Sequence, residues 1–136
     1  MKVVLDSNAL LVSISKKSFY RPIFDAFLEN KYLLAISNEV LTEYAEVLTR
    51  FASSNVADNI TELLATKDNA IKTEISYHWR LISADLDDNK FVDLSVASDA
   101  NFIVTNDAHF EVVKRIPFPK VSVINIQDFL EIVKKL

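Results

Sequence analysis

Short runs of wholly apolar residues alternate along the chain with longer segments in which apolar residues recur every three or four positions. The first pattern is typical of strands buried on both faces, and the second of helices with one buried face. The predicted strands are residues 3–5, 32–36, 102–105 and 121–124, and residues 72–77 are expected to be extended. The predicted helices are residues 22–30, a helix capped by Ser37 or Asn38 that ends near residue 50, residues 56–65, a helix that follows the acidic loop 85–89 and ends near residue 100, residues 109–114 and residues 127–135.

This alternation predicts an α/β fold. Parallel strands need a crossover connection, which helices usually provide, so the sheet should be mainly parallel, twisted and covered by helices on both faces. We expect one domain, residues 1–136, built as an α/β/α sandwich with Rossmann-like topology, because the sequence contains no repeats and no linkers. Ligands of such folds bind beyond the carboxyl ends of the strands.

Composition excludes several classes of protein. The chain has 136 residues, of which 50% are hydrophobic and 25% charged, as in one globular domain. We expect a cytoplasmic protein without membrane contact, since no stretch is apolar enough to span a bilayer and no secretory signal is visible. The absence of glycine excludes glycine-rich phosphate loops, and the absence of cysteine excludes Cys-based zinc sites. The formal net charge of −4 argues against binding of nucleic acid by bulk positive charge.

Two of the predicted strands lead into an acid. Asp6 directly follows the first apolar run, and Asp107 comes two positions after the strand at residues 102–105. Because parallel strands end at the same edge of a sheet, the two carboxylates should lie close together. A lone acid at such a place is often a helix cap or a turn residue, and that interpretation stays open for each of them.

Two predicted helices add further carboxylates. Glu43 lies at the edge of the apolar stripe of its helix, from which it can point towards the strand ends. Asp93 lies in a helix that is apolar nearly all round, so it needs either a salt bridge to lysine or arginine or a bound cation. Asn89 comes one turn earlier on the same face, so that the side-chain oxygens of Asn89 and Asp93 are expected together.

The acidic loop 85–89 resembles a calcium-binding loop in its alternating acids. An EF-hand loop needs glycine at its sixth position and glutamate at its twelfth, where this chain has Lys90 and Val96. The loop is therefore interpreted as a solvated turn or cap, and Asp88 is kept as a candidate beside the site.

The four candidate metal ligands and catalytic residues are Asp6, Glu43, Asp93 and Asp107. Carboxylates gathered in one cleft repel each other unless cations lie between them, and oxygen ligands without thiolates favour Mg²⁺ or Mn²⁺. Such ions support the hydrolysis of phosphodiesters by an activated water.

Four stretches carry a resemblance that spans nearly the whole chain: VVLDSNALL, ISNEVLTEYAEVL, DLDDNKFVDLSVASDANFIVTND and VSVINIQDFL. In this order and spacing they resemble PIN-domain proteins, the metal-dependent ribonucleases found in VapC-type toxins. The chain is similar in particular to a subgroup of toxin components with a DDNKF-type sequence. The resemblance implies a Mg²⁺- or Mn²⁺-dependent endoribonuclease acting on RNA, with frequent dimerisation and inhibition by a cognate antitoxin protein.

By position, Asp6, Glu43 and Asp107 match acids of the family. The neighbouring residues expected to bind substrate or to support the metal ligands are Ser7, Asn8, Asp88, Asn89, Thr105 and Asn106. One position departs from the pattern: Asn89 stands where most VapC-type members have their third acid, and Asp93, one turn later, is expected to compensate for it.

Two other functions stay open. A PIN-like module that binds a protein or RNA with little or no catalysis is supported by Asn89, because an amide is a weaker metal ligand than a carboxylate. A phosphatase of the haloacid-dehalogenase type would use Asp6 as its nucleophile, but it needs a second acid two residues later, where this chain has Asn8. The two histidines, His78 and His109, are interpreted as structural or surface groups.

Overall fold

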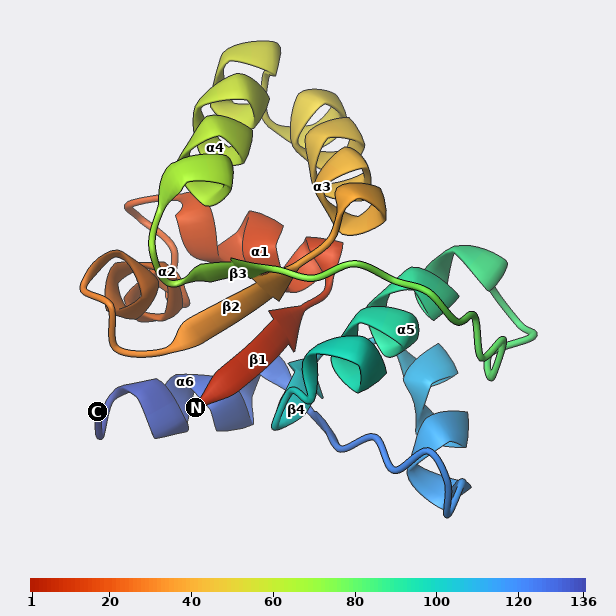
Figure 1. Cartoon of the computed structure of the whole chain (residues 1–136). Helices are drawn as coiled ribbons and strands as arrows, with labels where there is room; N and C mark the ends of the chain where they lie inside the picture. The colour runs from red at the N-terminus through yellow and green to blue at the C-terminus, as the bar shows by residue number, and fades with distance from the viewer.

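The computed structural model describes the whole chain, residues 1–136, and contains one five-stranded sheet in the order β3-β2-β1-β4-β5. The strands are β1 (Lys2–Leu5), β2 (Leu33–Ile36), β3 (Ala70–Lys72), β4 (Phe102–Val104) and β5 (Val123–Ile124). Every neighbouring pair of strands is parallel, so all the carboxyl ends lie at one edge of the sheet (Figure 1). The α/β fold with a mainly parallel sheet, expected from the sequence, is confirmed.

Helices cover both faces of this sheet (Figure 1). The α-helices are α1 (Ser7–Ile14), α2 (Arg21–Leu28), α3 (Asn38–Phe51), α4 (Ser54–Thr66), α5 (Asn89–Ser98) and α6 (Ile126–Val133), and the 3₁₀ segments are η1 (Leu86–Asp88) and η2 (Ala108–Arg115). On one face α5 packs against β1, β2 and β4, whereas α2 lies between α1 and α6 on the other. The helices α3 and α4 pack side by side as a hairpin above the sheet in this view. None of the helices has the length and apolar character needed to cross a membrane.

The central strands are buried on both faces. Val3 and Val4 of β1, and Ile103 and Val104 of β4, have no exposed surface and belong to one hydrophobic cluster that also includes residues of all six α-helices. Their apolar runs therefore have the composition expected of parallel strands between helical layers.

Two helices end without the glycine that commonly ends a helix. Asn30, after α2, has φ 60°, and Asp99, the C-cap of α5, has φ 54°. Among residues with a Cβ atom, Asn and Asp enter this left-handed region most readily, so the chain forms these turns without any glycine.

Some predicted elements differ from the observed ones. The helix α1 was not predicted, because Asp6, Ser7 and the following asparagine have the composition of a polar loop, and the rest of the helix is too apolar to show a clear period. Residues 72–77 contribute only Lys72 to a strand, since β3 begins earlier, at Ala70. The predicted helix at residues 109–114 is the 3₁₀ segment η2, and the last strand is shorter than predicted.

A buried tyrosine ties α3 to the carboxyl end of β1. Tyr44 has no exposed surface, and its hydroxyl donates a hydrogen bond of 2.5 Å to the carbonyl oxygen of Leu5. Burial raises the pKa of Tyr44 well above its usual value, so the hydroxyl keeps its proton and stays a donor. Glu43 precedes Tyr44 in the chain, and Asp6 follows Leu5. The bond between Tyr44 and Leu5 therefore fixes the position of α3 at Glu43 relative to Asp6.

We expect Tyr44→Phe to lower the free energy of unfolding by about 1–2 kcal/mol, because the Leu5 carbonyl loses a buried donor. Urea unfolding followed by circular dichroism measures the change. Tyr77→Phe is the control. Tyr77 is 63% exposed, so removal of its hydroxyl group should change the free energy of unfolding by less than about 0.5 kcal/mol. Equal effects of the two substitutions would contradict the role given to Tyr44.

Candidate metal centre

Asp6 lies in the middle of the carboxyl edge, at the end of the central strand β1. One carboxylate oxygen accepts a hydrogen bond of 2.7 Å from the backbone N–H of Ala9 and caps α1, and the other accepts from the hydroxyl of Thr105. Only 7% of Asp6 is exposed. Burial raises the pKa of Asp6, the two hydrogen bonds lower it, and the charge of Asp107 raises it further, with a net shift upwards. Asp6 therefore caps α1, while burial and the neighbouring Asp107 make its charged form less stable.

Thr105 places Asp107 beside Asp6. Its hydroxyl donates to Asp6 and accepts a hydrogen bond of 3.0 Å from the backbone N–H of Asp107. The register of the sheet produces this arrangement, because Leu5 pairs with Val104 and the next residue of each strand leaves the sheet at the same level. The expectation that Asp6 and Asp107 share an edge agrees with these contacts.

Glu43 reaches the same edge from α3. One of its carboxylate oxygens lies 3.5 Å from the hydroxyl of Ser7, the residue after Asp6, and the other forms a 3.0 Å ion pair with Lys90. Burial lowers the pKa of Lys90, but the hydrogen bond and charge of Glu43, with nearby acids, raise it overall, so this lysine stays charged. Asp6, Glu43 and Asp107 are called the inner acids below.

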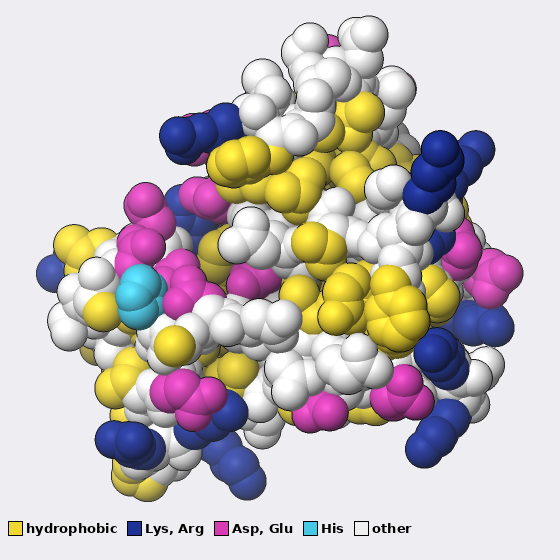
Figure 2. All heavy atoms as spheres, turned by 180° about the vertical axis from the view of Figure 1, so that it is seen from behind, with side chains coloured by type: hydrophobic (Ala, Val, Ile, Leu, Met, Phe, Trp, Pro, Cys, Tyr) yellow, Lys and Arg dark blue, Asp and Glu magenta, His cyan; other side chains and the backbone are white.

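A second group lies next to the inner acids. Asp85, Asp88 and His109 have ligand atoms within 4.8 Å of one another, and they are called the outer group. The ring Nδ1 of His109 is 3.2 Å from Asp88 and 3.3 Å from Asp107, so it joins the outer group to the inner acids. Figure 2 shows acidic side chains gathered around one histidine on this side of the molecule.

The pKa of Asp88 is raised, as is that of Asp6. Burial and the negative charge of Asp107 raise the pKa of Asp88, and its contact with His109 lowers it, with a net shift to about 6. Two carboxylates of neighbouring segments thus both resist ionisation. A proton or another cation would relieve this repulsion.

The protein supplies few cations of its own here. Lys90 pairs with Glu43, but no lysine or arginine forms a salt bridge with Asp6, Asp88 or Asp107. The available donors are carboxylate oxygens from several segments and a hydroxyl group, and there is no thiolate. Such a donor set suits a hard divalent cation such as Mg²⁺ or Mn²⁺. The residues present therefore fit the ion expected from the sequence.

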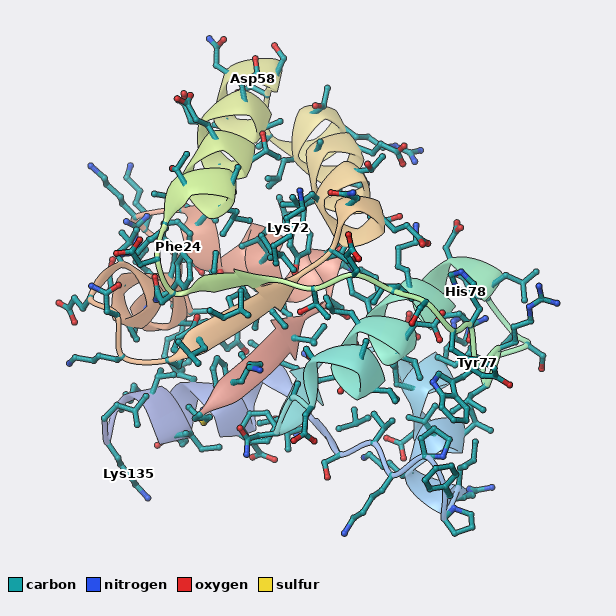
Figure 3. All side chains as sticks on the ribbon, viewed as in Figure 1. Phe24, Asp58, Lys72, Tyr77, His78 and Lys135 are labelled. Atoms are coloured by element: carbon teal, nitrogen blue, oxygen red, sulfur yellow. The ribbon has the colours of Figure 1, made fainter.

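Asp93 does not have the contacts expected of a fourth ligand. One of its oxygens accepts a hydrogen bond of 2.9 Å from the backbone N–H of Trp79, and the other lies 3.1 Å from Nδ1 of His78. Figure 3 shows His78 and Tyr77 on the coil that runs alongside α5. The partner that a buried carboxylate needs is therefore this coil, and Asp93 fastens His78 and Trp79 to the helix.

The other predicted residues divide between the site and its supports. Asn89 accepts from the backbone N–H of Ile82 and donates to its carbonyl oxygen, so both ends of its amide are bonded to the coil. Asn106 accepts from the backbone N–H at the start of α6, and Asn8 is exposed on α1. Ser7 contacts Glu43 as described above. 

Two residues lie closer to the inner acids than their sequence positions indicate. Asp88 was expected only beside the site, yet it lies within the electrostatic influence of Asp107. His109 was interpreted as structural or surface, yet it bridges two carboxylates. The available signal was its position two residues after Asp107, where its backbone N–H also binds that carboxylate.

Comparison with known proteins identifies the family of this chain. The family model described as "PIN domain" matches residues 2–109. The chain therefore belongs to the PIN-domain family. No curated protein sequence matches it significantly.

Solved structures give the same fold for this PIN-domain chain. Twelve chains of solved structures match it. One belongs to the crystal structure of VapBC2 from Rickettsia felis bound to a DNA fragment from their promoter, with 20% identity, a TM-score of 0.62, and coverage of 92% of this chain and 98% of that chain. At that identity the likeness concerns the fold.

For this PIN domain without metal, we expect Asp88→Asn to raise the free energy of unfolding at pH 7, on the order of 1 kcal/mol. The raised pKa means that the folded state binds the Asp88 proton more tightly than the unfolded state. Its stabilising contribution is full at low pH and is lost as the pH rises through about 6, so the charged carboxylate destabilises the fold above that. Urea unfolding in EDTA at pH 4 and pH 7 measures the difference.

The control for this experiment is Asp58→Asn, an exposed position on α4 (Figure 3). It should leave stability unchanged at both pH values. A loss of stability in Asp88→Asn at pH 7 would show that Asp88 is stabilised as an anion, contrary to the repulsion described.

We expect Asp93→Ala to lower the free energy of unfolding by about 1–3 kcal/mol, because it leaves the Trp79 N–H without its acceptor. Mn²⁺ affinity, measured by isothermal titration calorimetry, should stay within about twofold of the wild type, since Asp93 has no part in the inner acids. Asp6→Asn is the comparison, and it should lose most of its Mn²⁺ affinity. Equal losses in both variants would restore Asp93 as a ligand.

Proposed function

We propose that this PIN-domain chain is a metal-dependent endoribonuclease that hydrolyses RNA phosphodiesters, with residues 1–136 acting as one nuclease domain. The observation that carries the proposal is that Thr105 links Asp6 and Asp107 at the carboxyl edge of the sheet, with Glu43 in contact with Ser7 beside them and no lysine or arginine on Asp6 or Asp107. Membership of the PIN-domain family supports the reaction class.

The residues proposed to hold Mg²⁺ or Mn²⁺ are Asp6, Glu43 and Asp107, with Asp88 in place of Asp93 as the fourth acid. A divalent ion at this position would lower the pKa of an attacking water and offset negative charge on the phosphate. Thr105 orients the Asp6 carboxylate through its hydroxyl, and the backbone N–H of Ala9 fixes the second oxygen. His109 lies between Asp88 and Asp107, with its Nδ1 3.2 Å and 3.3 Å from their carboxylates.

We also propose a biological setting, which is the toxin of a toxin–antitoxin pair in the cytoplasm. The sequence resemblance to VapC-type toxins supports it, and so does the fold shared with a chain of VapBC2, which was crystallised with promoter DNA. In this setting the partners are RNA, a cognate antitoxin protein and a second copy of the chain.

A second candidate is a PIN-like binding module with weak catalysis. Asn89 no longer favours it, because the Asn89 amide is used by Ile82. The observation that does favour it is the ion pair between Lys90 and Glu43, which places a protein cation on one of the proposed ligands. If the wild type and the Lys90→Ala variant cleave RNA at the same metal-dependent rate, this candidate is excluded.

We expect cleavage of a fluorescently labelled single-stranded RNA to require Mg²⁺ or Mn²⁺ and to stop in EDTA. Asp6→Asn and Asp107→Asn should each reduce the rate at least about 100-fold, because each removes a charged ligand from the proposed centre. The measurement is the initial rate at fixed metal concentration. Asp58→Asn, far from the edge on α4, serves as the control and should cleave normally. Cleavage that persists in EDTA and in both variants would refute the proposed function.

A further inference from the structure

Three aromatic side chains form a cluster on the surface that none of the steps above uses. Trp79 lies edge-on between Tyr77 and Phe118, with ring centroids 4.6 Å and 5.8 Å away. Tyr77 is 63% exposed and Phe118 is 79% exposed. Exposed aromatic rings that lie together, instead of singly, are typical of an interaction surface. These three residues are called the aromatic cluster.

Unpaired cations adjoin the aromatic cluster. A cavity of about 430 Å³ is lined by Lys114, Arg115 and Lys120, and no acidic residue lines it. Phe118 lies in the chain between Arg115 and Lys120. Neither Arg115 nor Lys120 forms a salt bridge. In a chain with a net charge of −4, such a local excess of positive charge marks a surface suited to an anion.

This basic cavity continues towards the inner acids. A second cavity, of about 220 Å³, is lined by Thr105 and by the acids Asp107, Glu111 and Asp128, and Lys114 and Val123 line both cavities. Lys114, which pairs with Glu111, therefore lies at the border between the cavity beside Asp107 and the basic cavity.

The same structural segments hold the aromatic cluster and the outer group. Trp79 is fastened to α5 by Asp93, and the coil that contains it leads into Asp85 and Asp88. Phe118 follows η2, which carries His109. Contacts between Asp88 and His109, and between Trp79 and Phe118, thus join the same pair of segments at two places.

We propose that the aromatic cluster is a platform on which bases of single-stranded RNA stack, while Arg115 and Lys120 bind its phosphates beside the metal centre. The proposal deepens the proposed ribonuclease function and rests on it. Exposed aromatic faces next to cations are the usual means of binding single strands, whose bases are free to stack on side chains. In a duplex the bases are already stacked on one another, so the platform selects unpaired RNA.

Trp79 is the single tryptophan of the chain, so its fluorescence reports directly on the aromatic cluster. The experiment titrates the full-length protein in EDTA, where no cleavage occurs, with a single-stranded RNA oligonucleotide of mixed sequence and with its duplex. We expect the single strand to quench Trp79 and to bind at least about fivefold more tightly than the duplex. Tyr77→Ala and Phe118→Ala should each weaken binding about fivefold or more, measured by fluorescence anisotropy of labelled RNA.

Matched variants separate stacking from general effects. Phe51→Ala removes an aromatic ring on α3 that is as exposed as Tyr77, at 63%, and it should not change RNA affinity. Arg115→Glu should weaken binding and reduce its salt dependence, whereas Lys135→Glu, at the C-terminal end (Figure 3), should change little.

The outcomes distinguish this inference from the proposed function. Metal-dependent RNA cleavage with no quenching of Trp79, and with normal affinity in Tyr77→Ala and Phe118→Ala, would overturn the platform and leave the nuclease intact. Quenching and weakened variants without any cleavage would support the platform and refute the nuclease. Light scattering adds a further arm: if Phe118→Ala converts a dimer to a monomer and leaves RNA affinity unchanged, the cluster is a subunit contact and the inference is overturned.

Discussion

The structure depends on a group of like charges that the fold brings together and the protein does not neutralise. Asp6 is held at the end of the central strand by the N–H of Ala9 and the hydroxyl of Thr105, and the backbone then places Asp107 beside it. Burial and mutual repulsion raise the pKa of Asp6 and of Asp88. Such an arrangement destabilises the unbound protein at neutral pH, and a bound divalent cation would reverse that cost. The proposed chemistry follows from this one constraint.

Polar residues around the carboxyl edge fall into two groups, those of the proposed metal centre and those that hold the neighbouring coil in place. Asp6 accepts hydrogen bonds from Ala9 and Thr105 at the edge itself, whereas Asp93 and Asn89 bond to backbone and side-chain groups of the coil at residues 77–82. This coil has no regular secondary structure, so its backbone groups lack the partners that a helix or sheet would provide. The side-chain hydrogen bonds from Asp93 and Asn89 hold it on α5 instead. The coil in turn carries Trp79, which links the supports of the metal centre to the proposed RNA platform.

The fold could largely be predicted from the sequence, and the candidate site only in part. The alternation of apolar runs with helical segments predicts parallel strands, and the common direction of those strands places Asp6 and Asp107 at one edge. The choice between Asp88 and Asp93 could not be predicted, because it depends on where residues 77–82 lie, and that irregular coil has no periodic pattern. The bridging position of His109 likewise depends on contact between η1 and η2, segments that are twenty residues apart and joined through tertiary packing. Local sequence predicts elements well, but a buried carboxylate shows its role only through its partners.

Crystals of the protein grown with Mn²⁺ and measured at the manganese absorption edge would show whether the inner acids bind a divalent ion. We predict an anomalous peak coordinated by Asp6 and Asp107 at about 2.0–2.3 Å, with Glu43 or Asp88 completing the protein ligands. A peak found only among Asp85, Asp88 and His109, or no peak at all with Lys90 still paired to Glu43, would contradict the account.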